Sequence, residues 1–318
     1  MTALEFENKE IEAIVEKALL SDYSDPNIIL KDHSKYGNDS MQELILLGQL
    51  LENKEKYIGF LDHNLRKNKL GFHYYENGDI FVGQWKNNQK NGLGVHIHNV
   101  SSKNKRQAME VTFGSWHEDK FDKEGIYTWL EEAQGNDDIM NCDFQAFVGE
   151  FAKEKFRRGV ALTLSDKKFY IYYGKFEDGK KHDDSCYFYD NDLKTDRVFR
   201  GVVKADVVQE GFFITLHKET IDDLVFMKFN EGQPKEVCTM KDINNEVIDK
   251  IEEECLRFRE CLYEDDWFGL IYEKTKLAYK IIKEFKMEDF NNKAKYDELK
   301  EVVESFKSVG LYNSICNH

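Results

Sequence analysis

Proline, paired cysteine motifs and long apolar runs are scarce or absent in this sequence, and the last two absences each exclude a class of protein. Only two prolines occur among the 318 residues, Pro26 and Pro234. The six cysteines include no Cys-x-x-Cys pair, so their spacing matches no zinc site, and reduced intracellular thiols are expected. No apolar run approaches the ~20 residues that a membrane-spanning helix needs. The chain is therefore not expected to be integral to a membrane.

Net positive charge is also absent, because the chain carries a formal charge of −15. This excess of acid repels phosphate backbones and anionic lipid headgroups, so nucleic-acid binding is not expected and membrane attachment is disfavoured. The acidic N-terminal stretch lacks the apolar core of a secretory signal and the arginine-rich pattern of a mitochondrial presequence. An intracellular protein is the resulting expectation.

What the sequence does contain is a repeated glycine flanked by large apolar side chains. The pattern aromatic-x-Gly-x-aromatic, with some substitutions, is centred on Gly59, Gly83, Gly114, Gly149, Gly174 and Gly201, and Met227 centres a degraded seventh copy. Successive centres lie 24, 31, 35, 25, 27 and 26 residues apart, so two spacings contain insertions. A second glycine follows about ten residues later in most copies. Self-similarity at this period indicates a repeat architecture.

The second copy shows the local structure expected of the unit. Asn77-Gly78 separates two strand-like segments, and this dipeptide favours the positive φ angles of a tight hairpin turn. Phe81, Gly83 and Trp85 share one face of the next strand, so a ring from a neighbouring strand is expected to lie on the bare glycine. A hairpin this small cannot bury its aromatic face alone, so successive hairpins are expected to pack together.

This pattern resembles the MORN (membrane occupation and recognition nexus) repeats, whose unit is about Tyr-x-Gly-x-Trp-x-x-Gly-x-x-x-Gly-x-Gly. Residues 81–94 match it nearly throughout, with Asn88 at the turn glycine, and residues 172–179 match its first half. The likeness covers roughly residues 57–232, within which Thr112, Val203 and Met227 depart from the motif. The resemblance implies a single-layer antiparallel sheet with a scaffold role, as in cytoskeletal assemblies and the radial spokes of ciliary axonemes.

Helical periodicity flanks the repeats. Apolar residues spaced by three and four predict a helix over residues 3–20, and Ser40 with Glu43 has the spacing of a capping box before a second helix that buries Leu44, Leu47 and Leu51. Beyond Pro234, three apolar stripes predict helices near residues 247–262, 270–285 and 296–306. These helices could form a small bundle or pack against the sheet.

The predicted fold class is therefore α+β. An elongated single-layer antiparallel β-sheet of MORN-like hairpins is expected over residues 57–236, between an N-terminal helical segment over residues 1–56 and a C-terminal helical domain over residues 237–318.

Catalytic and metal-binding patterns are weak in the sequence. His96 and His98 share one strand face and could bind a metal, but no third ligand is evident nearby, so exposed strand histidines are the simpler interpretation. Residues 183–192 resemble a calcium loop only in their acidity, because the glycine and glutamate of that loop are missing. No glycine loop precedes a helix as in nucleotide sites. We therefore predict no enzyme, no catalytic residue, no cofactor and no metal.

Binding to other proteins is the function that we expect. The candidate contact residues are Trp85, Trp116, Phe151 and Phe176, although rings at repeat positions more often pack one hairpin on the next. An acidic sheet face with aromatic patches suits a helix or an extended peptide of another protein. The insertions at residues 99–109 and 131–143 are interpreted as solvated loops, and a contact role for the basic first loop stays open.

The expected function is that of a non-catalytic scaffold or adaptor in a large multi-subunit assembly, cytoskeletal or ciliary by resemblance. Two alternatives stay open. One is a peripheral phosphoinositide-binding protein, for which only Lys86, Lys90 and residues 103–106 could supply a positive face. The other is an accessory subunit of an organellar complex. No nucleic acid and no small-molecule ligand is expected, and the expected location is the cytoplasm and cytoskeleton, including the cilium.

Overall fold

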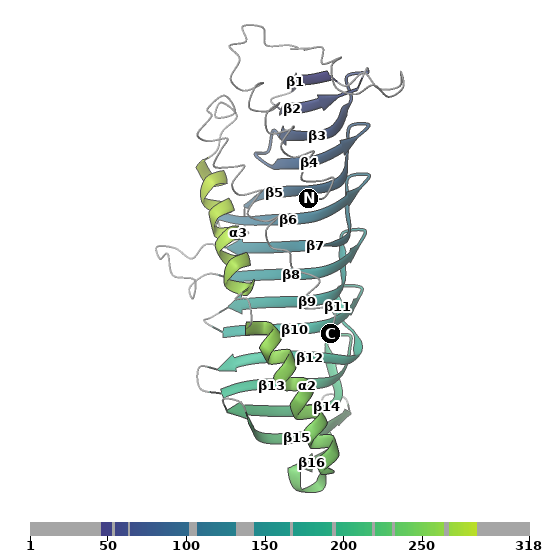
Figure 1. Cartoon of the computed structure of the whole chain (residues 1–318), viewed down its shortest axis with the longest axis vertical. Helices are drawn as coiled ribbons and strands as arrows, with labels where there is room; N and C mark the ends of the chain where they lie inside the picture. The colour runs from purple at the N-terminus through teal and green to yellow at the C-terminus, as the bar shows by residue number, and fades with distance from the viewer. Residues whose placement is uncertain are drawn as a thin grey trace, which may run out of the picture. The chain divides into compact units, whose positions relative to one another are not determined.

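The structure, a computed structural model, describes residues 46–52, 55–62, 64–101, 107–131, 143–165, 168–192, 195–217, 220–230, 233–263 and 267–284 (Figure 1). The helix predicted over residues 3–20, the beginning of the second predicted helix and the helix predicted near residues 296–306 lie outside these residues. So do most of the two insertions, at residues 102–106 and 132–142.

Strands make up most of the described chain. They are β1 (Leu46–Glu52), β2 (Glu55–Leu61), β3 (Lys67–Tyr74), β4 (Ile80–Lys86), β5 (Gln89–Ser101), β6 (Gln107–His117), β7 (Lys120–Glu131), β8 (Asp143–Ala152), β9 (Lys155–Ser165), β10 (Lys168–Glu177), β11 (Lys180–Lys181), β12 (Asp183–Asp192), β13 (Thr195–Lys204), β14 (Val207–His217), β15 (Thr220–Asn230) and β16 (Gln233–Thr239). A 3₁₀ turn η2 (Met240–Asp242) leads to the helices α2 (Asn245–Tyr263) and α3 (Trp267–Glu284).

The strands follow one another in the order of the chain, from β1 through β10 and β12 to β16, and β11 pairs with β10 beside this path. Neighbouring strands such as β3 and β4 or β8 and β9 are antiparallel. The predicted fold class, a single-layer antiparallel sheet of consecutive hairpins with helices, is confirmed. Among the described helices, none has the length and apolar character needed to cross a bilayer.

The chain divides into two compact units. The described residues of the first fall within Met1–Val100, Met109–Asp122 and Lys276–Ser308, and those of the second fall within Ser101–Ala108 and Lys123–Thr275. In the first unit, one sheet face buries an apolar cluster that receives Ala278 from α3: Ile58, Phe72, Ile80, Val95, Ile97, Met109 and Val111. The other face carries glycines and aromatic rings.

Glycines of successive strands stand opposite one another. In the first unit Gly48 faces Gly59, Gly59 faces Gly71, Gly71 faces Gly83 and Gly83 faces Gly94. In the second unit the row contains Gly125, Gly149, Gly159 and Gly174, and further along it Gly201 and Gly211. Met227 faces Gly211, so the degraded seventh copy keeps the register of the repeat.

The ring that covers Gly83 comes from the same strand, so its predicted origin in a neighbouring strand is wrong for this glycine. Rings of the preceding strand do cover Gly71, Gly94 and Gly211. A Cβ atom added to Gly83 would lie 2.7 Å from Cζ of Phe81, and one added to Gly94 would lie 2.5 Å from the same atom. Phe199 covers Gly201 and Gly211 in the same way. Each ring therefore lies along its own strand and then reaches the glycine of the next strand.

The hairpin turns use left-handed backbone at residues other than glycine. Asn87 and Asn88 have φ angles of 52° and 69°, and Ala205 and Asp206 have φ angles of 52° and 70°. Two consecutive positive φ angles are the signature of the tight turn that matches the twist of the flanking strands. The turn predicted at Asn77-Gly78 is confirmed, because Gly78 has a φ of 88° between β3 and β4.

Leu46–Glu52 forms strand β1, so the helix predicted from Ser40 through Leu51 is wrong for these residues. The prediction considered only the spacing of leucines and a local capping box. Pairing with β2 sets Gly48 opposite Gly59 and supplies a sheet partner along the whole segment. The sheet also continues to Thr239, so strands reach beyond both predicted limits, residues 57 and 236.

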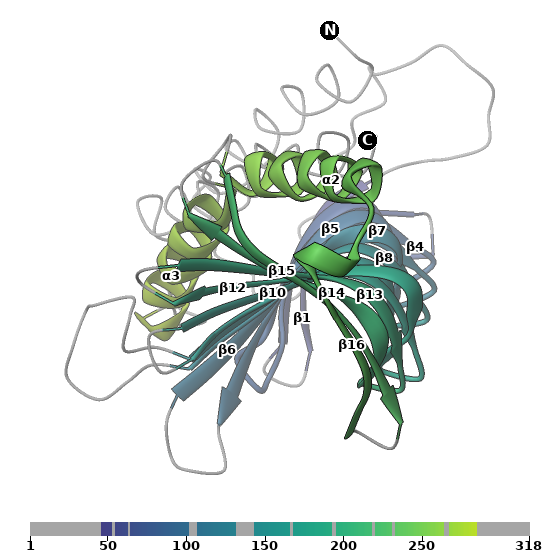
Figure 2. The same cartoon turned by 90° about the horizontal axis from the view of Figure 1, so that it is seen from below.

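The predicted helices near residues 247–262 and 270–285 are confirmed as α2 and α3, and both pack on the sheet face opposite the glycine row. Figure 2 shows α2 on one side of the sheet. Phe258 of α2 stacks on Tyr187 with ring centroids 4.8 Å apart, and Oε2 of Glu254 lies 2.6 Å from Nε of Arg200. At the start of α3, Tyr272 meets Phe144 edge-on at 5.3 Å. The described parts of both helices therefore contact the sheet.

Candidate functional site

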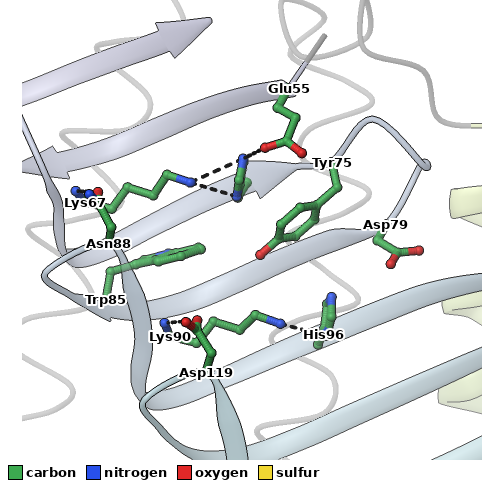
Figure 3. A pocket seen from close by; sticks show the side chains of 10 residues that line it. Glu55, Lys67, Tyr75, Asp79, Trp85, Asn88, Lys90, His96 and Asp119 are labelled. Carbon is green, nitrogen blue, oxygen red and sulfur yellow. Dashed lines mark hydrogen bonds and ion pairs between the residues drawn. The ribbon is translucent and has the colours of Figure 1, made fainter. Parts of the chain in front are cut away.

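A pocket of about 410 Å³ opens on the glycine-bearing face of the first unit (Figure 3). Its walls carry three carboxylates, two lysines, two histidines, two aromatic rings and an amide: Glu55, Asp79, Asp119, Lys67, Lys90, His73, His96, Tyr75, Trp85 and Asn88. These side chains come from two consecutive copies of the repeat and from the turn of a third. The pocket is thus a product of stacking hairpins.

The backbone of each pocket lysine, Lys67 and Lys90, is held by the turn of the next hairpin. The amide of Lys67 donates to Oδ1 of Asn88 at 2.7 Å, and the amide of Asn88 donates to the carbonyl of Lys67 at 3.0 Å. Lys90 and Asp119 make the same pair of bonds at 2.7 and 3.0 Å. Asn and Asp suit this place because they tolerate left-handed backbone and offer a side-chain acceptor.

The ammonium groups of these lysines lie over aromatic rings and beside histidines. Nζ of Lys67 lies 4.9 Å from the ring centroid of Trp85, and Nζ of Lys90 lies 4.6 Å from that of Trp116. Each Nζ also lies 3.1 Å from Nδ1 of a histidine, His73 for Lys67 and His96 for Lys90. Since an ammonium group can only donate, Nδ1 of each imidazole accepts and Nε2 carries the ring proton.

Burial keeps both histidines neutral. His73 and His96 are 4% and 5% exposed. Burial, together with the nearby lysines, lowers the pKa of His73 to about 3 and that of His96 to about 2. Neutral imidazoles at ordinary pH can serve as hydrogen-bond partners or metal ligands.

The two copies differ in what Nε2 contacts. Nε2 of His73 lies 3.1 Å from Oε2 of Glu55. The corresponding carboxylate of the next copy, Asp79, instead contacts Nδ1 of His98 at 2.7 Å. Among the described residues, Nε2 of His96 is buried and has no hydrogen-bond partner. A buried donor without an acceptor costs about 1–3 kcal/mol of folding free energy. The second copy therefore contains an unsatisfied polar atom that a ligand could satisfy.

Asp79, His96 and His98 could hold a metal ion. Each offers one ligand atom, and these atoms lie within 4.8 Å of one another. The sequence-based interpretation of His96 and His98 as exposed strand residues is wrong for His96, which is buried, and it did not consider Asp79 as a possible third ligand. The strand register would have revealed Asp79, because pairing of Phe81 with His96 places Asp79 beside His98.

The four predicted protein-binding residues lie among the ring contacts. Trp85, Trp116 and Phe151 are 3%, 6% and 6% exposed, and Phe176 is half-buried. The indole N–H groups of Trp85 and Trp116 donate to the carbonyls of Gly71 and Gly94, each at 3.2 Å. Of the four, only Trp85 lines the pocket. Because Trp85, Trp116 and Phe151 are buried, they expose little surface to a partner protein.

A second aromatic surface lies on the glycine-bearing face of the second unit, and we name it the phenylalanine row. Its members are half-buried: Phe147, Phe156, Phe176, Phe188, Phe213 and Phe229. Phe147 and Phe156 have ring centroids 5.2 Å apart, and Phe156 and Phe176 have theirs 5.0 Å apart. Of this row the sequence analysis singled out only Phe176 as a contact residue.

Burial disfavours the thiolate form of two described cysteines, Cys186 and Cys255. Cys186, Cys238 and Cys255 are free thiols. Burial raises the pKa of both Cys186 and Cys255 to about 12. Both thiols therefore stay protonated and are weak nucleophiles. The acidic segment Asp183–Asp192 is strand β12, and Asp183 accepts hydrogen bonds from the amides of Lys175 and Ser185.

Comparison of the sequence with protein-family models and with curated proteins gives no match. The repeat pattern and the geometry of the two surfaces are therefore what support a function.

Proposed function

We propose that this chain is a non-catalytic, MORN-like scaffold that binds other proteins within a large assembly. A cytoskeletal or ciliary setting is part of the proposal and comes from the resemblance of the repeat. The phenylalanine row is the observation that carries the proposal. It offers a row of half-buried rings on a sheet face that α2 does not contact in the described part of the chain.

Half-buried rings held in fixed positions are suited to protein recognition. A ring that is already packed on its neighbours loses little conformational entropy on binding, while its exposed edge still supplies apolar area. Phe213, for example, contacts Phe199 at 4.9 Å and Phe229 at 6.0 Å between ring centroids. Such a surface fits the apolar face of a helix or the alternate side chains of an extended peptide.

The test is affinity purification from native cells of the full chain and of a Phe213→Ser variant, followed by identification of the bound proteins. Phe213 is half-buried, so its loss should spare the fold and remove the apolar surface. We expect a defined set of partners with the unmodified chain and at least about tenfold less of them with Phe213→Ser, as for a central aromatic contact.

The matched control is Phe212→Ser. Phe212 is the preceding residue of the same strand, is also half-buried, and contacts Phe226 at 4.9 Å between ring centroids, which places it on the opposite face. We expect Phe212→Ser to retain the partners. Equal retention by both variants, or the absence of any reproducible partner, would overturn the proposal.

A further inference from the structure

We propose that Asp79, His96 and His98 form a binding site for a divalent metal ion of the zinc type. Two imidazoles and one carboxylate are a ligand set that suits zinc and neighbouring transition metals, whereas magnesium and calcium prefer oxygen ligands. The site goes beyond the scaffold role, which neither requires nor excludes it.

The geometry brings the three ligand atoms together before any ion binds. His96 and His98 lie two residues apart on β5, with ring centroids 3.8 Å apart. Asp79 comes from the turn before β4, where its amide donates to Oδ1 of Asn77 at 3.0 Å. Because the carboxylate position is fixed by this turn and the imidazoles by the strand, little ordering remains to be done on binding.

The buried nitrogen of His96 is the independent sign of a ligand. Its Nε2 atom lacks a hydrogen-bond partner among the described residues, although the side chain is 5% exposed. A metal ion at Nε2 would occupy this atom. It would also take the place of the proton between Asp79 and Nδ1 of His98, which lie 2.7 Å apart, and that proton would move to Nε2 of the same imidazole.

The preceding copy of the repeat shows what the site would be without its second histidine. There, Glu55 replaces Asp79, His73 replaces His96 and Tyr75 replaces His98, and His73 is satisfied by Lys67 on one nitrogen and Glu55 on the other. In the preceding copy, both ring nitrogens of the histidine therefore have partners. The next copy has the same framework but contains a second imidazole, that of His98, and Nε2 of His96 has no hydrogen-bond partner among the described residues.

Lys90 acts as an internal competitor of the ion. Its ammonium donates to Nδ1 of His96, which keeps the ring proton on Nε2. When Nε2 binds a metal, that proton moves to Nδ1, and the ammonium must leave because it cannot accept a hydrogen bond. Removing the ammonium should therefore tighten metal binding.

The test is titration of the full chain with zinc chloride, read by calorimetry and by diethylpyrocarbonate labelling of histidines with mass spectrometry. We expect zinc to protect His98, whose side chain is 36% exposed, from labelling. His182, at 38% exposure beside Glu177, is the internal control and should stay reactive. Magnesium and calcium should protect neither histidine.

Variants separate the site from other zinc contacts. His98→Gln should weaken zinc binding by on the order of tenfold or more, whereas Glu55→Gln, a change at the position of the preceding copy that corresponds to Asp79, should leave it unchanged. Lys90→Met should tighten it several-fold. Circular dichroism and the Tm without metal verify the folding of each variant. Absence of zinc-dependent protection at His98, or equal affinity in His98→Gln, would overturn the site, and unchanged or weaker affinity in Lys90→Met would overturn the competition.

Discussion

Replacing Gly83 with valine is expected to destabilise the first unit by about 3 kcal/mol or more, as overpacking against unyielding atoms does. A Cβ atom at this position would lie 2.5 Å from Cα of Gly94, 2.7 Å from Cζ of Phe81 and 2.8 Å from the carbonyl oxygen of Leu93. Two of these atoms belong to the backbone of the paired strand. The strands would have to separate, so the cost cannot be relieved by a side-chain rotation.

Chemical denaturation of the Gly83→Val variant measures this loss. Gly78→Asn is the control in the same hairpin, because Gly78 has a φ of 88° and a Cβ there would meet only Oη of Tyr74, at 3.9 Å. Asparagine tolerates left-handed backbone, so the control should lose less than about 1 kcal/mol. Equal stability of Gly83→Val and the unmodified chain would contradict the close packing of this glycine.

Replacing Phe144 with alanine is expected to destabilise the second unit by about 4 kcal/mol, the usual cost of emptying a large buried aromatic site. Phe144 is 0% exposed, and its ring meets Tyr272 of α3 edge-on at 5.3 Å. The cavity would lie directly beneath the helix. Faster hydrogen exchange at the start of α3 should therefore accompany the lower midpoint of denaturation.

The matched control for this cavity is Tyr170→Ala. Tyr170 lies on β10 of the same unit and is 45% exposed, so its removal should cost less than about 1 kcal/mol and leave exchange in α3 unchanged. If Phe144→Ala lowered the stability while α3 kept its protection, the inferred dependence of the helix on this ring would be wrong.

Much of the fold could be predicted because its information is local and repeated. The spacing of glycines fixes the hairpin period, and Asn77-Gly78 specifies a turn without reference to distant residues. Even Met227 could be assigned to the series, and it does face Gly211 in the sheet. The two C-terminal helices followed from apolar stripes, since amphipathic periodicity is a strong signal.

The errors arose where partners in space decided the outcome. Leu47 and Leu51, which stand at helical spacing, also fit a strand once β2 is there to pair with them. The ring over Gly83 belongs to Phe81 because the strand geometry lets the side chain fold back, which no spacing rule states. Asp79 lies 17 residues before His96, and only the β4–β5 register brings them together.

The candidate surfaces were harder to predict than the fold for a related reason. Motif aromatics such as Trp85 and Trp116 stand out in the sequence. In the structure their rings are buried and their indole N–H groups donate to glycine carbonyls. The half-buried phenylalanines and the orphaned nitrogen of His96 depend on what neighbouring strands leave exposed or unsatisfied. Those are properties of the assembled sheet.

The claim that bare glycines make room for rings is tested most directly by a double-mutant cycle of Gly94→Ala and Phe81→Leu. A Cβ at Gly94 would meet Cζ and Cε2 of Phe81 at 2.5 and 2.8 Å, and leucine has neither atom. Measured by denaturation, Gly94→Ala should cost about 2 kcal/mol alone and at least about 1 kcal/mol less in the Phe81→Leu background. Additive losses, within about 0.5 kcal/mol, would contradict it.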